Sequence, residues 1–199
     1  MHHPLLARFY DTFLWPGERL GMASQRDRLV GHLSGTVLEV AVGTGLNLPH
    51  YPATVTVDAI EIDPHMLRKA KSRAAEAICD VRLHEADVHR LPFEDKVFDH
   101  AVVSLALCTI PEPGKALAEI ARVVRGDVHF LEHVRSPSPA RARWQHRVAP
   151  AWSRFAGGCR LGQDTEAVIT AAGYTITDMW RSSGGGMIQG VAKPASDDR

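Results

Sequence analysis

The chain has 199 residues, with 23 Lys plus Arg and 23 Asp plus Glu, so its formal net charge is zero. This balance does not indicate nucleic acid, an anionic membrane surface or an acidic polymer as a partner, and it favours a small, roughly neutral one. The three cysteines, Cys79, Cys108 and Cys159, lack the paired spacing of disulfide frameworks and zinc sites. No apolar run approaches the roughly 18 residues that cross a bilayer. We therefore expect one cytoplasmic domain without a metal or a membrane anchor.

The first 33 residues predict a helical cap, because apolar and aromatic residues recur there at near-helical spacing with a break at Pro16-Gly17. From Thr36 onward short apolar runs alternate with helical patterns, which indicates repeated βαβ units and a mostly parallel sheet. The expected strands are 36–41, 55–62, 79–84, 97–104 and 127–134, and the expected helices between them are 63–77 and 113–125.

The last third of the chain predicts a different arrangement. Residues 137–155 are rich in Arg and Trp, and residues 164–172 predict a helix. Two further strands, 174–180 and 187–192, are expected to form a closing hairpin around the glycines at 184–186. With the five preceding strands, this predicts a doubly wound α/β fold with seven strands and helices on both faces.

The first expected strand runs into a glycine loop. Glu39 lies within this strand, four residues before Gly43, and Gly45 follows. Glycines at this position let the backbone pass close to a ligand at the carboxyl end of the strand. A nicotinamide or flavin site would have a third glycine where this chain has Leu48, so we disfavour a dehydrogenase.

Two more acids follow successive strands. Glu61 ends the second strand, where an acid accepts hydrogen bonds from ribose hydroxyls; the alternative is a helix cap, a role that Asp63 already fills. Asp87 follows the third strand, where a carboxylate can accept the exocyclic amine of adenine, although a single loop Asp is usually only solvated. Because these acids end successive strands, they and the glycine loop together predict a nucleoside site.

These motifs resemble the class I S-adenosylmethionine (SAM)-dependent methyltransferases over roughly residues 36–134, in LEVAVGTGLN, AIEIDPHML, EADVHRLPFEDKVFDHAVVSLALCTIP and KALAEIARVVR. The resemblance implies a Rossmann-like fold with a SAM-binding core at 36–134, an acceptor side at 135–193, and S-adenosylhomocysteine as product. The cofactor residues that it implies are Glu39, Ala41, Gly43 and Gly45 for the methionine part, Glu61 for the ribose, Met66, Asp87 and Val88 for adenine, Ser104 beside the methyl group, and Ile62. The family usually has glycine at the position of Ala41.

The C-terminal third carries a narrower resemblance, in LEHVRSPS, WQHRVAPAW and GGCRLGQDT. These segments are similar to a branch that includes animal thiol S-methyltransferases and bacterial phosphatidylethanolamine methyltransferases. The resemblance implies a small acceptor such as a thiol or a phenol. Alternatives are a phospholipid, to which the absence of the animal members' N-terminal anchor gives less weight, and a SAM-binding protein that does not methylate. The absence of Asn-Pro-Pro-Tyr after the fourth strand argues against nucleic-acid amino-methylating enzymes.

Methyl transfer is an in-line displacement, so a base is needed only if the acceptor carries a proton. His133, at the end of the fifth strand, is the candidate base; a structural histidine is the alternative. Cys108, after the fourth strand, is a candidate for the methyl pocket or for the core. With Cys159 and His146 these residues could form a scattered metal site, but their spacing gives it no support, so we predict no metal.

The acceptor pocket is expected between the N-terminal helices and residues 133–160, the two segments that lie outside the cofactor motifs. Trp144, Trp152 and Phe155 recur along a helical stretch there. They predict either an aromatic roof over the acceptor or ordinary packing on the sheet.

Overall fold

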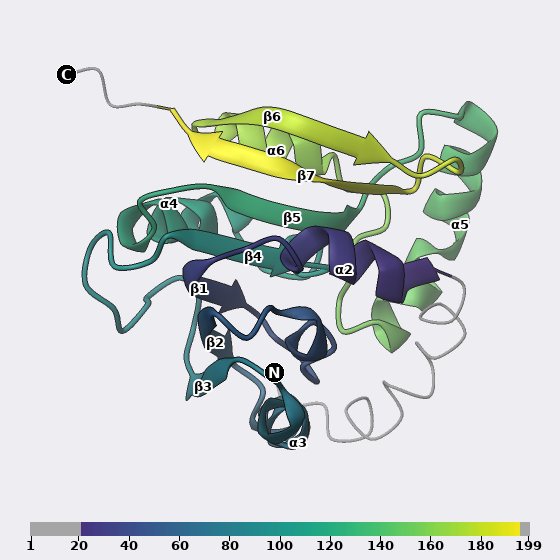
Figure 1. Ribbon diagram of the computed structural model, residues 1–199. Coiled ribbons are helices and arrows are strands. Elements are labelled where there is room, and N and C mark those ends of the chain that lie inside the picture. Colours follow the sequence, from purple (N-terminus) through teal and green to yellow (C-terminus); the bar gives the residue numbers. More distant parts are fainter. Residues whose placement is uncertain (1–20, 196–199) are drawn as a thin grey trace.

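The computed structural model describes residues 21–195, and one sheet with the strand order β3-β2-β1-β4-β5-β7-β6 runs through it (Figure 1). Five adjacent strands are parallel to one another: β1 (Gly35–Val40), β2 (Val55–Glu61), β3 (Asp80–Glu85), β4 (His100–Ser104) and β5 (Val128–His133). The hairpin pairs β6 (Tyr174–Arg181) with β7 (Met187–Pro194), and β7 is antiparallel to β5 as well. The predicted seven-stranded, mostly parallel sheet is confirmed.

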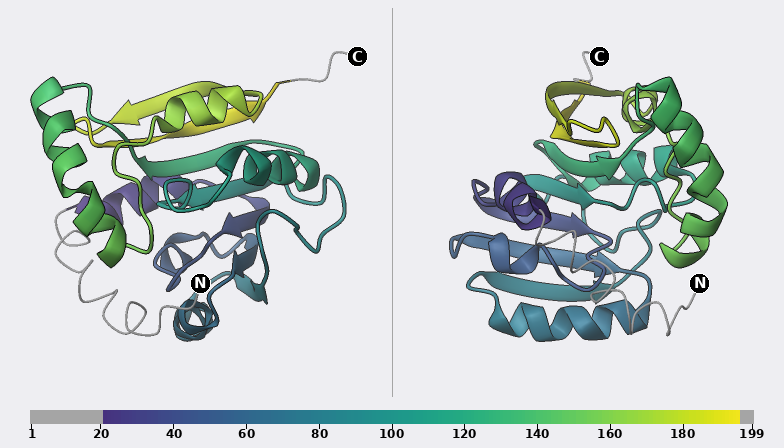
Figure 2. Two further views of the ribbon diagram at one scale, coloured as in Figure 1. Left: turned by 180° about the vertical axis from the view of Figure 1, so that it is seen from behind. Right: turned by 90° about the vertical axis from the view of Figure 1, so that its right-hand side faces the viewer.

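Helices cover both faces of the sheet, as Figure 2 shows. Side chains alternate between the two faces of a strand, so β1 contributes Val37 to one core and Leu38 to the other. The first core also holds residues of α2 (Ala23–Val30) and α3 (Pro64–Glu76). The second core holds residues of α4 (Pro113–Val123) and α6 (Thr165–Ala171).

The predicted helix starts are confirmed at α3 and α6. The Asp63 carboxylate accepts a hydrogen bond of 2.7 Å from the backbone N–H of His65, with Pro64 in the first turn. Asp164 caps α6 in the same way, accepting 3.1 Å from the N–H of Ala167. A short 3₁₀ helix, η2 (Leu48–His50), follows the glycine loop.

Helix α5 (Pro139–Phe155) lies beyond the end of the sheet at which β6 points its arrowhead in Figure 1. β6 is antiparallel to β7, and β7 is antiparallel to β5, so β6 runs in the same direction as the five parallel strands. The helix therefore lies near the carboxyl edge of the sheet, where ligands bind in folds of this type. Of the described residues, none belong to a helix long and apolar enough to cross a membrane.

The start of the fourth strand differs from the predicted one, and only part of the predicted N-terminal cap lies within the described residues. The fourth strand begins at His100, not at residue 97, because the Asp99 carboxylate accepts the backbone N–H of Thr36 at 2.8 Å and Phe98 forms only an isolated bridge. Of the two predicted N-terminal helices, the second is α2, and the first lies outside the described residues.

Candidate functional site

A hollow of about 300 Å³ opens at the carboxyl ends of β1, β2 and β4, a size within the range of ligand pockets. Five chain segments close it: α2, the end of β1 with the loop after it, the turn from β2 into α3, the end of β4 with the loop after it, and the residues directly after α5. The lining residues are 41–44, 46–47, 61–63, 66, 104–106, 109–111 and 156–157, with Arg26 and Glu39. Of the predicted cofactor residues, seven line it: Glu39, Ala41, Gly43, Glu61, Ile62, Met66 and Ser104.

The loop after β1 turns because three of its residues have positive φ values: Ala41 with 53°, Gly43 with 59° and Gly45 with 85°. A side chain on Gly43 would meet no protein atom closer than the carbonyl oxygen of Ala41 at 3.9 Å, so the loop leaves open space there. Gly45 has another role. A Cβ there would lie 2.9 Å from Leu48 Cδ1, so the absence of a side chain lets the loop pack closely on η2 and α3. Gly45 is therefore a packing residue, outside the lining.

Glu61 stands at the centre of this site. One carboxylate oxygen accepts the backbone N–H of Gly43 and the other accepts that of Asp63, both at 2.9 Å. A carboxylate has about four acceptor positions, so two remain for further donors such as a pair of vicinal hydroxyls. Burial raises the pKa of Glu61, and the two backbone N–H groups oppose that change.

A buried polar chain crosses the floor of the pocket and was missed by the sequence analysis. Arg26 Nη1 donates 2.5 Å to Asn47 Oδ1, and Asn47 Nδ2 donates 2.9 Å to Glu39 Oε1. The same guanidinium lies 3.5 Å from Ser104 Oγ. Arg26 belongs to α2, whose sequence contains no motif, although Asn47 belongs to the glycine loop. Burial raises the pKa of Glu39 to about 7.

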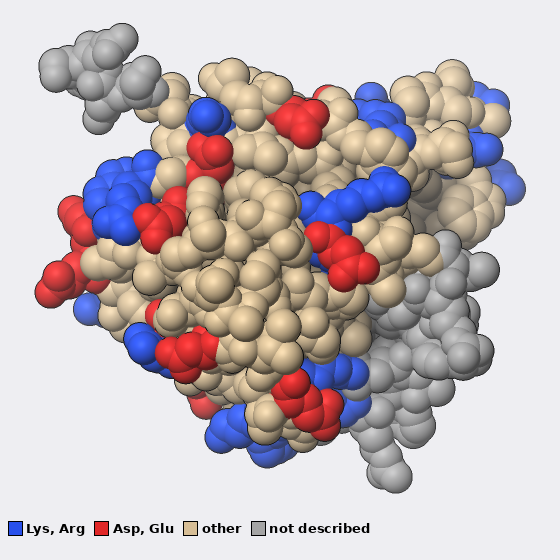
Figure 3. Space-filling view, viewed as in Figure 1, with Lys and Arg blue, Asp and Glu red and all other residues tan. Residues whose placement is uncertain are grey.

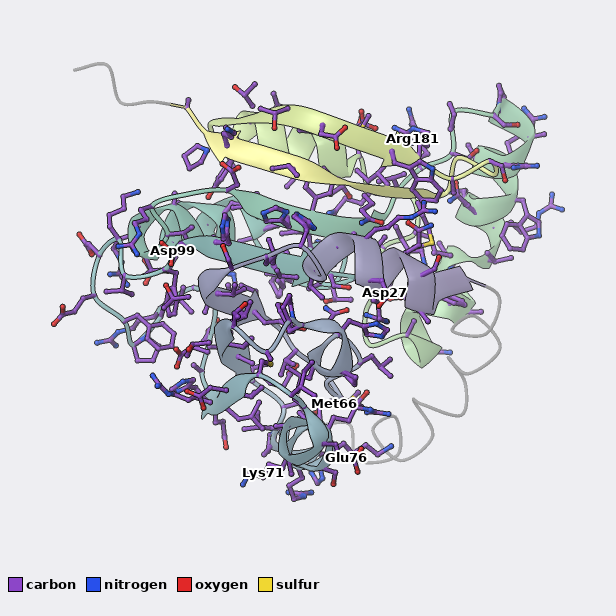
Figure 4. All side chains as sticks on the ribbon, viewed as in Figure 1. Asp27, Met66, Lys71, Glu76, Asp99 and Arg181 are labelled. Atoms are coloured by element: carbon purple, nitrogen blue, oxygen red, sulfur yellow. The ribbon has the colours of Figure 1, made fainter. Side chains whose placement is uncertain are left out.

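An apolar platform lies next to Glu61. Ile62 is 54% exposed and lines the pocket, as does Ile110 of the loop after β4. Met66 adds a polarizable side chain, and Figure 4 labels it on the side of α3 that faces α2. A flat aromatic base is the kind of group that such a slot accommodates.

Asp87 and Val88 lie outside the lining, at the rim next to this slot. One oxygen of Asp87 accepts the backbone N–H of His89 at 2.9 Å and also contacts its Nδ1 at 2.6 Å. The backbone N–H of His89 lowers the pKa of Asp87 most. His89 Nε2 in turn donates 2.7 Å to the carbonyl of Pro111, which lines the pocket. The Val88 side chain is buried in the core.

The loop after β4 is held by a buried acid. Glu132 Oε1 accepts the backbone N–H groups of Ala106 and Leu107 at 2.8 and 2.9 Å. Leu105, directly before them, has φ 54°, a strained value for a branched residue and one that tends to occur at functional sites. Burial raises the pKa of Glu132 to about 7.

The two predicted catalytic residues, His133 and Cys108, are close to each other but do not line the pocket. The Cys108 side chain is fully buried, and its Sγ lies 3.2 Å from Cys159 Sγ. His133 Nδ1 lies 3.8 Å from the same Cys159 sulfur. The hydrogen bond with Cys108, followed by contacts with His133, lowers the pKa of the Cys159 thiol. A catalytic role for His133 or Cys108 stays a prediction.

The predicted aromatic roof is only partly described. Trp152 packs edge-to-face on His133, with ring centroids 6.1 Å apart. Trp144 is 63% exposed on α5, and the Phe155 side chain lies outside the described residues. His146, the fourth residue of the scattered metal site, is exposed on α5 and is not part of the cluster of Cys108, His133 and Cys159.

Comparisons with known proteins agree with this geometry. Residues 38–142, more than half of the chain, match the family model described as a methyltransferase domain. The chain belongs to the SAM-dependent methyltransferases, which its strand order and glycine loop had indicated. A phosphatidylethanolamine N-methyltransferase of Cereibacter sphaeroides is 36% identical over 140 residues, 66% of each chain. The human thiol S-methyltransferase TMT1B is 29% identical over 84% of this chain and 75% of its own length.

Solved structures share the fold at low identity. Magnesium protoporphyrin IX methyltransferase of Synechocystis PCC 6803, solved with bound S-adenosylhomocysteine, has a TM-score of 0.66 and 17% identity, over 89% of this chain and 85% of its own. The [4+2]-cyclase SpnF has a TM-score of 0.68 and 19% identity, over 88% and 80%.

The residues of the pocket fit SAM, the cofactor of this family. The open side of Gly43 allows close approach, Glu61 keeps two acceptor positions for the ribose, and the charge of Arg26 can balance a carboxylate. The bound cofactor supplies an electrophilic methyl group on a sulfonium.

Proposed function

We propose that this chain transfers the methyl group of SAM to a small, roughly neutral acceptor, with thiols and phenols as the favoured class. The distribution of charge in the pocket carries the proposal. Arg26, Glu39, Glu61 and Asp63 gather on the side of the glycine loop and β2. The rest of the wall is formed mainly by small and apolar residues, among them Ala106, Ile110, Ala156 and Gly157. An uncharged acceptor is best placed against such a wall.

The proposed division of labour follows the geometry. Glu61 takes the ribose hydroxyls, while Ile62, Met66, Asp87 and the backbone of Val88 take the adenine. Glu39 and the backbone of Ala41 and Gly43 take the methionine part, and Arg26 its carboxylate. Gly45 holds the loop on α3. We assign Ser104, which lines the pocket, to the place where the methyl group and the acceptor meet, and residues 135–193, of which Ala156 and Gly157 line it, to the acceptor side of a single domain.

A thiol acceptor makes few chemical demands on the enzyme. A thiol is a few per cent thiolate at neutral pH and strongly nucleophilic in that form. Alignment with the methyl group and exclusion of water then supply most of the catalysis. This fits a pocket whose acceptor side holds hydroxyls, Ser104 and Thr109, and small apolar groups. The 29% identity to a human thiol S-methyltransferase supports the same class.

Phosphatidylethanolamine is the second candidate acceptor. The 36% identity to a bacterial phosphatidylethanolamine N-methyltransferase favours it, as does the exposed Trp144 on α5, since Trp is suited to membrane interfaces. The face shown in Figure 3 does not separate the candidates, because Lys and Arg are interspersed with Asp and Glu there. A cytoplasmic location is proposed on the basis of the three free thiols.

The deciding experiment measures transfer of an isotope-labelled methyl group from SAM to a panel of thiols, phenols, amines and phosphatidylethanolamine vesicles. We expect methylated thiol or phenol with the wild type and none with Gly43→Val, which blocks the cofactor. A series of thiols with different pKa values tests the mechanism. The pH at which the rate is half-maximal should rise and fall with the pKa of the acceptor thiol. Tight binding of S-adenosylhomocysteine without transfer to any acceptor class would make the chain a non-methylating SAM binder.

A further inference from the structure

Three potential metal-ligand atoms, two sulfurs and one imidazole nitrogen, lie close together outside the pocket lining, although their residues are far apart in the sequence. The sulfurs of Cys108 and Cys159 are 3.2 Å apart, and His133 Nδ1 is 3.8 Å from the second sulfur. All three atoms lie within 4.8 Å of one another. They come from the loop after β4, the end of β5 and the segment after α5. We propose that Cys108, His133 and Cys159 bind one thiophilic metal ion of the zinc class.

The distances suit a tetrahedral ion after a small adjustment. Zinc lies about 2.3 Å from sulfur and about 2.0–2.1 Å from imidazole nitrogen, which places two zinc-bound sulfurs about 3.8 Å apart. The observed separation of 3.2 Å therefore has to grow by about 0.6 Å. A modest rotation of the two Cys side chains achieves this without movement of the backbone.

Hydrogen bonds hold the two cysteine segments together. The Arg160 backbone N–H donates 2.9 Å to the carbonyl of Cys108, and its guanidinium donates to the carbonyls of Leu107 and Ile110 at 3.2 and 2.7 Å. Gln163 adds a bond of 3.1 Å to Leu107. Arg160, which follows Cys159, is thus bonded to the loop that carries Cys108 at three carbonyl groups. Such outer bonds orient the ligands of metal sites.

The third ligand is tied to the same framework. Glu132, the neighbour of His133, accepts the Leu107 N–H at 2.9 Å and lies 3.4 Å from the Cys108 N–H. The position of the β5 end is therefore coupled to the loop that carries Cys108. A site whose three ligand-bearing segments are cross-braced loses little entropy when it binds an ion.

Charge balance favours a metal over a disulfide of the same sulfurs. Two thiolates, a neutral imidazole and a divalent ion sum to zero, so the loaded site can be buried without net charge. A disulfide would use only two of the three groups. It would also need an oxidant to reach sulfurs on residues that are 0% and 4% exposed. A metal enters while the chain folds.

The donor set selects the class of ion. Thiolate and imidazole ligands favour zinc and other soft ions over magnesium and calcium. Three protein ligands leave one coordination position open, as in catalytic zinc sites. The cluster adjoins the acceptor side, because Thr109 follows Cys108 and Gly157 precedes Cys159 by two positions, and both line the pocket. This inference does not depend on which acceptor is methylated.

The test uses the full chain, which is reduced, unfolded, freed of metal by a chelator and then refolded with increasing amounts of Co²⁺, alone or together with Zn²⁺. We expect one equivalent of cobalt to give thiolate-to-cobalt charge-transfer absorption, which zinc abolishes where it is present. Cys108→Ser, Cys159→Ser and His133→Gln should each weaken binding at least about tenfold, since even outer-shell changes cost 10- to 100-fold. Cys79→Ser is the matched control, a buried cysteine outside the cluster, and should bind as the wild type does.

Two results would overturn the inference. One is the absence of the charge-transfer absorption in wild type that circular dichroism shows to be folded. The other is unchanged absorption in a folded variant of either cysteine. If a cysteine variant fails to fold, His133→Gln and the wild-type titration decide. Thiol counting that finds Cys108 and Cys159 joined as a disulfide, with no metal uptake after reduction, would assign the pair to redox chemistry instead.

Discussion

The backbone N–H of Gly43 donates a 2.9 Å hydrogen bond to the carboxylate of Glu61. The two residues end neighbouring parallel strands, so the bond joins the glycine loop to the acid that ends β2. The same side chain that is proposed to hold the ribose therefore also holds the loop that is proposed to hold the methionine part.

Glu61→Ala should weaken binding of S-adenosylhomocysteine by at least tenfold, because loss of hydrogen bonds to a charged group costs about 1.5–3 kcal/mol. Isothermal titration calorimetry measures the change. Glu85→Ala is the matched control, since Glu85 pairs with Glu61 in the sheet register but is exposed outside the pocket. Affinity of Glu61→Ala within twofold of the wild type would move the ribose elsewhere.

Substitutions at Gly43 and Gly45 should affect different properties, cofactor affinity at Gly43 and stability at Gly45. Gly43→Ala places a methyl group in open space beside the pocket, so it should reduce cofactor affinity and leave a folded protein with a modest loss from the positive φ. Gly45→Ala places Cβ 2.9 Å from Leu48 Cδ1, and should lower the melting temperature more. Thermal unfolding and calorimetry on both variants give the comparison. If the two variants changed cofactor affinity and melting temperature equally, the distinction between a binding role for Gly43 and a packing role for Gly45 would be wrong.

Ala41→Gly should stabilise the protein. Ala41 has φ 53°, which costs an L-residue about 1–2 kcal/mol, whereas glycine adopts it freely. Part of the gain is lost to the greater freedom of the unfolded chain, leaving about 0.5–1 kcal/mol. Denaturant unfolding measures this. Ala75→Gly, at an exposed helical position of α3, is expected to change stability in the opposite direction.

Asp87→Ala should reduce the preference for adenosine over inosine. The Asp87 oxygen not engaged by His89 can accept the adenine amine, but it cannot accept from the carbonyl of inosine. Competition between S-adenosylhomocysteine and its inosine analogue measures the ratio. His89→Ala tests whether the histidine positions the carboxylate. Unchanged discrimination in Asp87→Ala would place the adenine contact at another residue.

Buried His129 predicts a loss of stability in mild acid. Burial first, and then repulsion from His100 and His32, lowers its pKa from 6.5 to about 4. Between these values the unfolded chain binds a proton that the folded chain does not, so stability falls as the pH drops from 6.5 to 4. The contribution is about 3 kcal/mol, since each pKa unit corresponds to about 1.4 kcal/mol. Unfolding of His129→Gln across this range should show a shallower slope, whereas exposed His146→Gln should match the wild type.

Much of the fold follows from local sequence. The alternation of apolar runs with helical patterns, the Asp63-Pro64 start of α3 and the glycines after β1 act over a few residues, so their outcome could be predicted. The start of β4 could not, because it depends on a hydrogen bond from Thr36 on the neighbouring strand β1 to Asp99. The close packing of Gly45 on Leu48 and Ala70 likewise depends on contacts that the sequence pattern does not specify.

The sequence by itself determined the family, the mostly parallel α/β sheet and the acid that ends β2, since each depends on patterns and motifs that are local in the chain. Only the tertiary structure decided that Arg26 reaches the pocket floor and that Cys108, His133 and Cys159 meet. The sulfurs of Cys108 and Cys159 are 51 residues apart in the chain and 3.2 Å apart in space. Sheet pairing and the packing of the segment after α5 set such distances, and neither is encoded in local spacing.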